Sequence, residues 1–288
     1  MKVIANAKVN LHLDVVRLRD DGYHEIETIF QSVGLADELI VEVTDNGRIE
    51  ITCDDPGIPT DERNLCHRAV VEMRRLTKGP LGARIDLAKR IPTEAGLGGG
   101  SADAAAVLLA INRATRLHAP EGALFEVASR IGSDVPFMLK GGTMLGRGRG
   151  EILTPMTPLM SGFFLIVKPN VNISTAEVYA GFNSRLTRQR PRLNLRAVSS
   201  VLARFPEVSP PFRNALEDVV CPSYPIVAKT LDELMSEQPC FASMTGSGAA
   251  LFAVFRDREP AERLATKFSV RGFFSTVVKP AKRAVYFE

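Results

Sequence analysis

Cysteine is scarce in this sequence, with four residues among 288. They stand at positions 53, 66, 221 and 240, without a C-x-x-C pair and without the spacing of a zinc site. Neither a disulfide framework nor a structural zinc site is therefore expected. The pattern favours a reduced setting, and we expect a cytoplasmic protein.

Long hydrophobic runs are also missing. The longest apolar runs, such as residues 162–167 and 249–255, are far too short to cross a bilayer. The first eight residues, M-K-V-I-A-N-A-K, lack the apolar core of a secretory signal. We therefore expect no membrane partner.

The net charge is small, +3 at neutral pH, and does not argue for a nucleic-acid partner, although a local basic site stays open. With 45% hydrophobic and 24% charged residues, the composition is typical of a soluble globular protein. A chain of this length folds as one large domain or as two domains of ordinary size.

Glycine is concentrated in one stretch, P-T-E-A-G-L-G-G-G-S-A-D, at residues 92–103. Its glycines, Gly96, Gly98, Gly99 and Gly100, permit positive φ and close approach of a ligand to the backbone. The alanine- and leucine-rich run that follows has strong helix propensity, and Ser101 or Asp103 is expected to cap this helix. A glycine loop at a helix N-terminus presents free N–H groups and the positive end of the helix dipole, which predicts a phosphate site.

Two familiar nucleotide loops are excluded by spacing. No lysine follows the glycines, as G-x-x-x-x-G-K-[ST] would require, and the sixth place of G-x-G-x-x-G is occupied by Ser101 or Asp103. A tight turn before a core helix is the plainer alternative, but four glycines in five positions exceed what a turn needs. We therefore expect a nucleotide-binding loop of another kind.

Residues 8–15 alternate between polar and apolar side chains, which predicts a half-buried strand. Its polar face would carry Lys8, Asn10, His12 and Asp14. Such a face is usually solvated. The presence of a lysine, an amide, an imidazole and a carboxylate on one face leaves the wall of a site as the alternative.

Further strands and helices follow from local patterns. Strands are expected at residues 25–33, 38–43, 48–53, 83–88, 163–167, 251–255 and 272–278, with a hairpin around residues 45–47. Helices are expected at residues 64–75, 123–131, 174–182, 197–205, 215–220, 226–235 and 259–268. Strands and helices mixed out of strict βαβ order indicate an α+β fold.

Three further segments are expected to form a hairpin, a loop or a turn. Residues 141–150 should form a hairpin, with phosphate contact by Arg147 and Arg149 as the less favoured alternative. Residues 185–192 should form a solvated loop, and residues 244–250 a second glycine-rich turn. A change to Pro, Thr and Met near residues 154–161 predicts a boundary between domains 1–155 and 156–288.

Three motifs, in this order, resemble those of the GHMP kinases: A-K-V-N-L at residues 7–11, the glycine stretch at 92–105, and M-T-G-S-G-A-A at 244–250. Further motifs resemble the branch of that family that acts on 4-diphosphocytidyl-2-C-methyl-D-erythritol. These are D-G-Y-H at 21–24, G-S-D-V-P at 132–136, G-R-G-E at 148–151 and K-P at 168–169. The resemblance covers nearly the whole chain.

The resemblance implies a two-domain fold with the active site in the interdomain cleft. It implies transfer of the γ-phosphoryl group of ATP, with Mg²⁺, to the 2-hydroxyl of a small-molecule alcohol. Asp134 would be the general base, and Lys8 would orient it and stabilise charge. The sequence does not assign the Mg²⁺ ligands or the oligomeric state.

The remaining expected site residues also come from the resemblance. ATP would be held by Asn64, Lys89, Pro92, Thr93, Glu94, Ala95, Gly96, Leu97, Gly98, Gly99, Gly100, Ser101 and Ala102. The substrate would be held by Asn10, Tyr23, His24, Thr175 and Tyr179. Many relatives have a serine where this chain has Ala102, whose side chain cannot contact phosphate or Mg²⁺.

Alternatives remain for both residues and function. Asp134 could cap the turn that begins at Val135, and Lys8 could be a surface lysine of its strand; the resemblance favours catalysis for both. The nearer alternative function is a GHMP kinase acting on mevalonate, phosphomevalonate or homoserine. The more distant one is a relative that binds nucleotide without catalysis. Tyr23, His24 and Tyr179 favour the cytidyl substrate.

Overall fold

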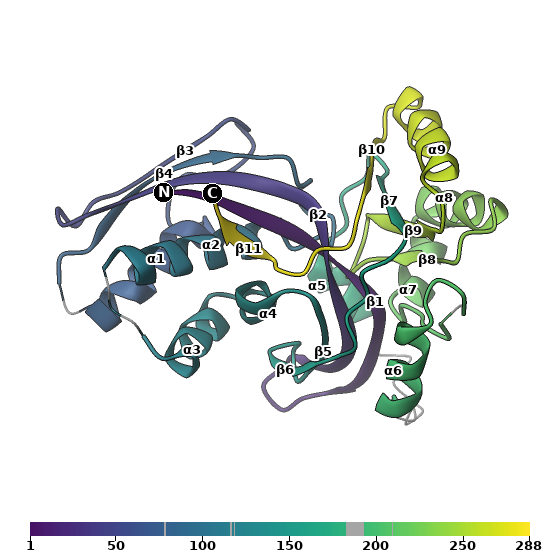
Figure 1. The fold of residues 1–288 in the computed structure, drawn as a ribbon, viewed down its shortest axis with the longest axis horizontal. Helices are drawn as coiled ribbons and strands as arrows, with labels where there is room; N and C mark the ends of the chain where they lie inside the picture. The colour runs from purple at the N-terminus through teal and green to yellow at the C-terminus, as the bar shows by residue number, and fades with distance from the viewer. Residues whose placement is uncertain (78, 116, 118, 183–192, 209) are drawn as a thin grey trace.

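The computed structural model describes residues 1–77, 79–115, 117, 119–182, 193–208 and 210–288. The predicted loop at residues 185–192 lies outside these ranges. Two β-sheets, each with its own helices, form the two lobes seen in Figure 1. The mixture of helices and strands confirms the predicted α+β class.

The first sheet has seven strands, with the order β11-β1-β2-β4-β3 and with β5 and β6 attached to β2. Its strands are β1 (Lys2–Leu18), β2 (His24–Thr44), β3 (Ile49–Cys53), β4 (Gly82–Ala88), β5 (Thr143–Arg147), β6 (Ile152–Pro155) and β11 (Val285–Phe287). The second sheet has the order β10-β7-β9-β8. Its strands are β7 (Phe163–Lys168), β8 (Phe241–Met244), β9 (Leu251–Phe255) and β10 (Phe274–Val278).

The helices divide between the lobes (Figure 1). The first lobe contains α1 (Leu65–Thr77), α2 (Gly99–Ala114), α3 (Glu121–Ile131) and α4 (Val135–Lys140). The second contains α5 (Thr175–Phe182), α6 (Leu195–Ala203), α7 (Glu217–Ser223), α8 (Pro225–Ser236) and α9 (Arg258–Val270). None of the helices in the described ranges combines the length and apolar character needed to cross a membrane.

The long strands β1 and β2 reach from one lobe to the other (Figure 1). β2 runs without a break for 21 residues, so the prediction of two separate strands at 25–33 and 38–43 is wrong. Pairing with β1, β4 and β5 along different parts of its length keeps the backbone extended through the intervening residues. Where the end of β1 and the start of β2 reach the second lobe, Leu13 and Val15 of β1 and Ile26 of β2 pack in the core of that lobe.

A register shift between Asn6 and Lys8 changes which side chains of β1 face the helices. Before it, Val3 and Ala5 pack in the core that contains α2. After it, Ala7 and the next two odd-numbered residues pack against the second sheet instead. A bulge inverts the alternation of a strand because one extra residue is inserted. Here it turns Lys8 toward the face of the sheet where α2 and α4 begin.

The predicted hairpin at residues 45–47 is also corrected. Gly47 does adopt a positive φ of 70°, as a turn there requires. However, β3 pairs in parallel with β4, and β4 lies between β2 and β3. The turn is held from outside, because the N–H of Gly47 donates to the carbonyl of Pro80. The local turn signal was correct, but the more apolar β4, with buried Ile85 and Leu87, takes the inner position.

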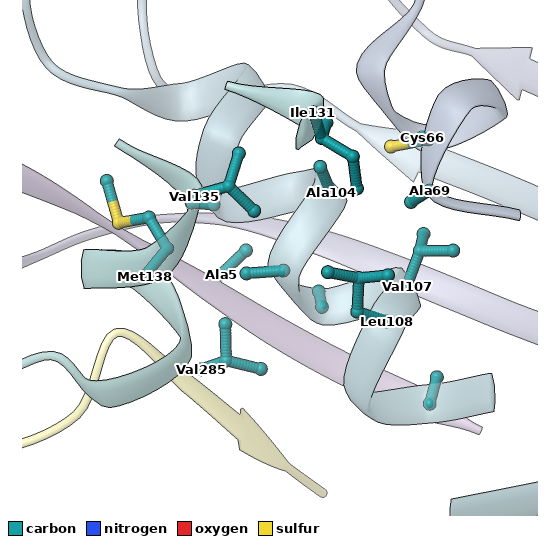
Figure 2. Packing of buried hydrophobic residues seen from close by; sticks show 14 of the residues in the cluster. Ala5, Cys66, Ala69, Ala104, Val107, Leu108, Ile131, Val135, Met138 and Val285 are labelled. Carbon is teal, nitrogen blue, oxygen red and sulfur yellow. The ribbon is translucent and has the colours of Figure 1, made fainter. Parts of the chain in front are cut away.

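Small side chains let α2 pack closely against the first sheet. Figure 2 shows Ala104, Val107 and Leu108 of α2 among Ala5 of β1 and Val285 of β11. The helix begins at Gly99, earlier than the alanine run suggests, and no side chain caps it. The expected caps Ser101 and Asp103 therefore lie inside the first turns.

Asn214 fastens the second lobe to β1. Leu13 forms an isolated parallel bridge with Asn214, and backbone hydrogen bonds join Leu13 to the residues on either side of it. The Asn214 amide donates to the carbonyls of Met244 at 2.8 Å and Gly246 at 2.7 Å, and its oxygen accepts from the N–H of Leu216 at 3.0 Å. The backbone on either side of Asn214 thus joins β1, and its buried side chain connects the turn after β8 to the start of α7.

We expect Asn214→Ala to lower the free energy of unfolding by at least about 2 kcal/mol, because it removes three hydrogen bonds to buried backbone groups. Asn170→Ala is the control, since its exposed amide makes a single bond to the carbonyl of Gly272. That change should cost less than about 1 kcal/mol. Urea denaturation followed by circular dichroism measures both. Equal losses in the two variants would contradict the role given to Asn214.

Candidate active site

A cavity of about 730 Å³ lies where β1, β2, the start of α2 and α5 meet. Residues 133–134, just before α4, and the 246–247 turn complete its wall. The structure places both predicted catalytic residues and all five predicted substrate residues on this wall. Segments far apart in the sequence are therefore brought together at the junction of the two lobes.

The ammonium group of Lys8 is the central charge of the cavity. The side chain is buried, and its Nζ lies 3.3 Å from Oδ2 of Asp134 and donates to Oδ1 of Asn10 at 2.7 Å. It also lies 5.5 Å from the centre of the Phe30 ring. The polar face of β1 is buried at Lys8, Asn10 and His12, so it is not a solvated surface, and Lys8 and Asn10 line the cavity.

Asp134 occupies the position before α4 without capping it, because its carboxylate makes no hydrogen bond to the backbone of that helix. The structural alternative, an N-cap, is therefore not realised. The side chain is about a quarter exposed, at 28%, and pairs with Lys8. A carboxylate with one face toward an ammonium and another toward an open cavity can accept a proton from a bound hydroxyl.

The glycine loop meets the cavity through Gly96 and Ser101. Gly96 and Gly98 have φ values of 72° and 71°, which confirms the need for glycine at both places. The N–H of Lys8 donates to the carbonyl of Leu97 at 2.9 Å, so the loop lies directly beside this lysine. The N-terminus of α2, a 16-residue helix, thus opens next to the Lys8–Asp134 pair.

Other residues of the predicted ATP loop lie outside the cavity wall. Ala95, Leu97 and Ala102 are buried in the protein core. Because the side chain of Ala102 faces the core, a serine there would also point away from the cavity, whereas Ser101 lines it. The other predicted loop residues, Pro92, Thr93, Glu94, Gly98, Gly99 and Gly100, are partly or fully exposed beside it.

Aromatic side chains form the opposite wall. The rings of His24 and Tyr179 lie 5.0 Å apart, centre to centre, and Tyr23 is 55% exposed with the guanidinium of Arg149 4.8 Å from its ring. Burial raises the pKa of Tyr179, and the nearby charge of Asp134 raises it further, so its hydroxyl stays protonated. The rings suit the planar base of a nucleotide, and the guanidinium of Arg149 suits its negatively charged phosphates.

Comparison with known proteins identifies the family of this chain. Models of the N-terminal and C-terminal domains of GHMP kinases match residues 64–142 and 201–272. The chain belongs to the GHMP kinase family. A relative from Geobacter sulfurreducens, named 4-diphosphocytidyl-2-C-methyl-D-erythritol kinase, is 38% identical over 96% of this chain and 97% of its own length. A relative of the same name from a Synechococcus species is 39% identical over 89% and 86%.

Solved structures agree with this assignment. A crystal structure of 4-(cytidine 5'-diphospho)-2C-methyl-D-erythritol kinase superposes with a TM-score of 0.84 at 33% identity, over 98% of this GHMP kinase and 99% of that chain. Homoserine kinase from Cytophaga hutchinsonii superposes at 0.75 with 20% identity, over 99% and 96%. The second match shows the shared fold alone.

Two predicted ATP residues of this GHMP kinase are engaged within the protein. Lys89 lies beneath the loop, with Nζ 2.8 Å from Asp103 and in a second ion pair with Asp37. Burial lowers the pKa of Lys89, but the two carboxylates outweigh it and raise the pKa. Burial raises the pKa of Asp103 to about 7. Asn64 donates to the carbonyl of Pro59. Contact of Lys89 or Asn64 with ATP stays a prediction.

The structure adds two residues to the cavity wall: Arg149, expected from the sequence only as the less favoured phosphate contact, and Ser247, not predicted as a site residue. Arg149 lies in the turn between β5 and β6, which confirms the predicted hairpin, and it lines the cavity, whereas Arg147 pairs with Glu27. Ser247, in the second glycine-rich turn, lines the cavity with its Oγ 2.7 Å from Oγ1 of Thr175. The sequence signal for Ser247 is its place between Gly246 and Gly248 in the second glycine-rich turn, a motif that predicts a turn but does not by itself distinguish the serine hydroxyl as a site group.

Gly100 offers a clean test of the phosphate site. A Cβ there would meet only Cδ1 of Leu65, at 3.8 Å, whereas one at Gly98 would come within 2.5 Å of Met138 and disturb Lys8. We expect Gly100→Asp to raise the KM for ATP about tenfold or more, because a carboxylate at the helix N-terminus repels phosphate. Steady-state kinetics with varied ATP measures the change.

Gly100→Ala is the matched control and should keep the KM for ATP. Both substitutions should leave the thermal midpoint unchanged or higher, since either residue disfavours the helix less than glycine does. An unaltered KM in a folded Gly100→Asp enzyme would place the phosphates elsewhere.

Proposed function

We propose that this enzyme transfers the γ-phosphoryl group of ATP to the 2-hydroxyl of 4-diphosphocytidyl-2-C-methyl-D-erythritol, in non-mevalonate isoprenoid biosynthesis. The observation that carries the proposal is the Lys8–Asp134 pair, 3.3 Å apart, beside the open N-terminus of a glycine-initiated helix. The curated relatives of that name, at 38% and 39% identity over most of the chain, support the choice of acceptor. A cytoplasmic location stays a prediction.

In the proposed reaction, the 2-hydroxyl oxygen attacks the γ-phosphorus of ATP. Its proton passes to the carboxylate of Asp134, the bond between the γ-phosphorus and the β-phosphate oxygen breaks, and ADP leaves. Lys8 orients the carboxylate and offsets negative charge on the transferring group. Phosphoryl transfer relies on such positioning and charge stabilisation more than on covalent chemistry.

Backbone N–H groups of residues 96–101 would hold the phosphates of ATP. They are fixed by the helix and by the glycine turn before it, so they need no rearrangement when charge develops. The hydrogen bond from the backbone N–H of Lys8 to the carbonyl of Leu97 also holds this loop in place. The phosphate site and the catalytic pair are therefore parts of one rigid unit.

The residues present also fit Mg²⁺. Within the described ranges there is no group of three or more His, Cys, Asp or Glu side chains that could hold a metal. An ion held mainly by ATP phosphates and water would need few protein ligands, and the Ser101 hydroxyl and the Asp134 carboxylate, both on the cavity wall, are the groups that would hold it. When bound, it would neutralise charge on the phosphates.

The cytidyl group would lie against the aromatic wall, with Tyr23 and Tyr179 contacting its ring and His24 at its edge. Thr175 and Asn10 would contact the remaining polar groups of the substrate. The structural likeness to homoserine kinase does not favour that substrate, because 20% identity carries the fold alone. Retention of both Lys8 and Asp134 in one cavity argues against a non-catalytic relative.

We expect Lys8→Met and Asp134→Asn each to lower kcat by about 10²–10⁴-fold, because the first removes the charge beside the base and the second removes the base. The double variant should be little worse than the poorer single variant, because the two residues act in one step. Coupled detection of ADP release measures all three. Lys140→Ala, which changes an exposed pair with Glu121, is the control. Multiplicative losses would show that the two residues act separately.

A second prediction concerns the base of the substrate. Tyr179→Ala should raise the KM for the cytidyl substrate about ten- to a hundredfold through lost stacking, and leave its preference over a uridyl analogue largely intact. His24→Ala should erode that preference, because edge hydrogen bonds provide discrimination. Tyr179→Phe keeps the ring and should behave like the wild type. Equal use of both analogues by the wild-type enzyme would overturn the proposed substrate.

A further inference from the structure

Thr245 follows β8 directly and is fully buried, with a relative exposure of 0%. Its hydroxyl accepts from the backbone N–H of Asn10 at 3.0 Å. The same hydroxyl is 3.1 Å from the carbonyl of Gly96 and 3.2 Å from Oδ1 of Asn10, both of which are acceptors. Its single proton thus lies between the strand that bears Lys8 and the glycine loop.

Asn10 passes this constraint to the catalytic lysine. Its Oδ1 accepts from Nζ of Lys8 at 2.7 Å, and its Nδ2 donates to Oγ1 of Thr28 at 2.8 Å. The amide is therefore oriented by three groups: a hydroxyl on β2, the ammonium of Lys8 and the hydroxyl of Thr245. Without the Thr245 hydroxyl, the backbone of Asn10 loses its partner from the second lobe.

The backbone of Thr245 is equally constrained. Its N–H donates to the carbonyl of Ala250 at 3.0 Å, and its own carbonyl accepts from Gly248 at 3.1 Å. A Cβ added at Gly96 would lie 2.1 Å from the Thr245 carbonyl oxygen, so the two glycine turns are packed backbone to backbone. A displacement of the Thr245 hydroxyl would therefore require a displacement of the glycine loop at Gly96.

We propose that Thr245 is a positioning residue of phosphoryl transfer, whose hydroxyl sets the Lys8 ammonium, through Asn10, relative to the phosphate loop at Gly96. The inference rests on the proposed function, since it assumes that Lys8 takes part in the transfer. It assigns to the second glycine-rich turn a task in the chemical step and not only in packing.

Thr245→Val tests this with almost no change in volume. It should lower kcat at saturating ATP and acceptor by about 10- to 100-fold, as misplacement of catalytic groups does, and change the KM for the acceptor less than about threefold. Thr245→Ser, which keeps the hydroxyl, should retain kcat within about threefold of the wild type. Thr230→Val is the matched control, because Thr230 is equally buried and its hydroxyl bonds only within α8.

A double-mutant cycle with Lys8→Met separates positioning from simple structural damage. If Thr245 acts through Lys8, Thr245→Val should reduce kcat less than about threefold in the Lys8→Met background. An undiminished loss in that background would overturn the proposal, as would a Thr245→Ser enzyme as slow as Thr245→Val. Should Thr245→Val not fold, Thr245→Ala is carried through the same cycle with the same expectations.

The cycle does not depend on the identity of the acceptor. If wild-type enzyme fails with the cytidyl alcohol but phosphorylates another alcohol, the proposed substrate is wrong, and the cycle is run on that alcohol. If Thr245→Val lowers kcat equally in the wild-type and Lys8→Met backgrounds on an accepted substrate, the inference about Thr245 is wrong and the proposed function is unaffected.

Discussion

The burial of one ammonium group is the constraint on which this site depends. Transferring Lys8 from water into the protein costs several kcal/mol unless partners compensate, and a single partner is rarely enough. The partners come from different segments: Asn10 on the same strand, Asp134 before α4, and the ring of Phe30 on β2. Folding therefore cannot bury the lysine without assembling the cavity around it.

Both glycine-rich turns need glycine for positive φ and for the close approach of their two backbones. In the first, Gly96 and Gly98 take up positive φ and lead into a helix whose N–H groups are open to a ligand. In the second, Gly246 lies so close to the first turn that a Cβ would approach the Cα of Gly96 within 3.0 Å. A Cβ at Gly96 would in turn lie 2.1 Å from the carbonyl oxygen of Thr245, so the close approach requires glycine in both turns, and the first turn also leads into α2.

Local signals in the sequence predicted most helices and strands and the glycine loop, whereas the choice of Lys8 and Asp134 came from the family resemblance. Local signals failed where tertiary contacts decide. The predicted hairpin at residues 45–47 does not form, because β4 lies between the two strands that the turn connects. The predicted gap between two strands is part of β2, because this strand pairs with β1, β4 and β5 along its length. Alternation could reveal the polar face of β1 but not its burial, because the bulge after Asn6 and the second sheet are invisible to a single-strand pattern. Ion pairing of Lys89 likewise involves Asp37, which no local pattern connects to it.

β11 brings residues 285–287 back to the outer edge of β1, where Val3 pairs with Phe287 (Figure 1). Contacts between the extremes of a sequence form late and slow the assembly of the sheet that contains them. On a ribosome, the edge of β1 stays uncovered until nearly the whole of this sequence has emerged, while the strands and helices of the second lobe are already complete. An uncovered edge is open to pairing with other chains. The lobe that begins first in the sequence is thus the one completed last during synthesis, and its exposed edge is where association between nascent chains is most to be expected.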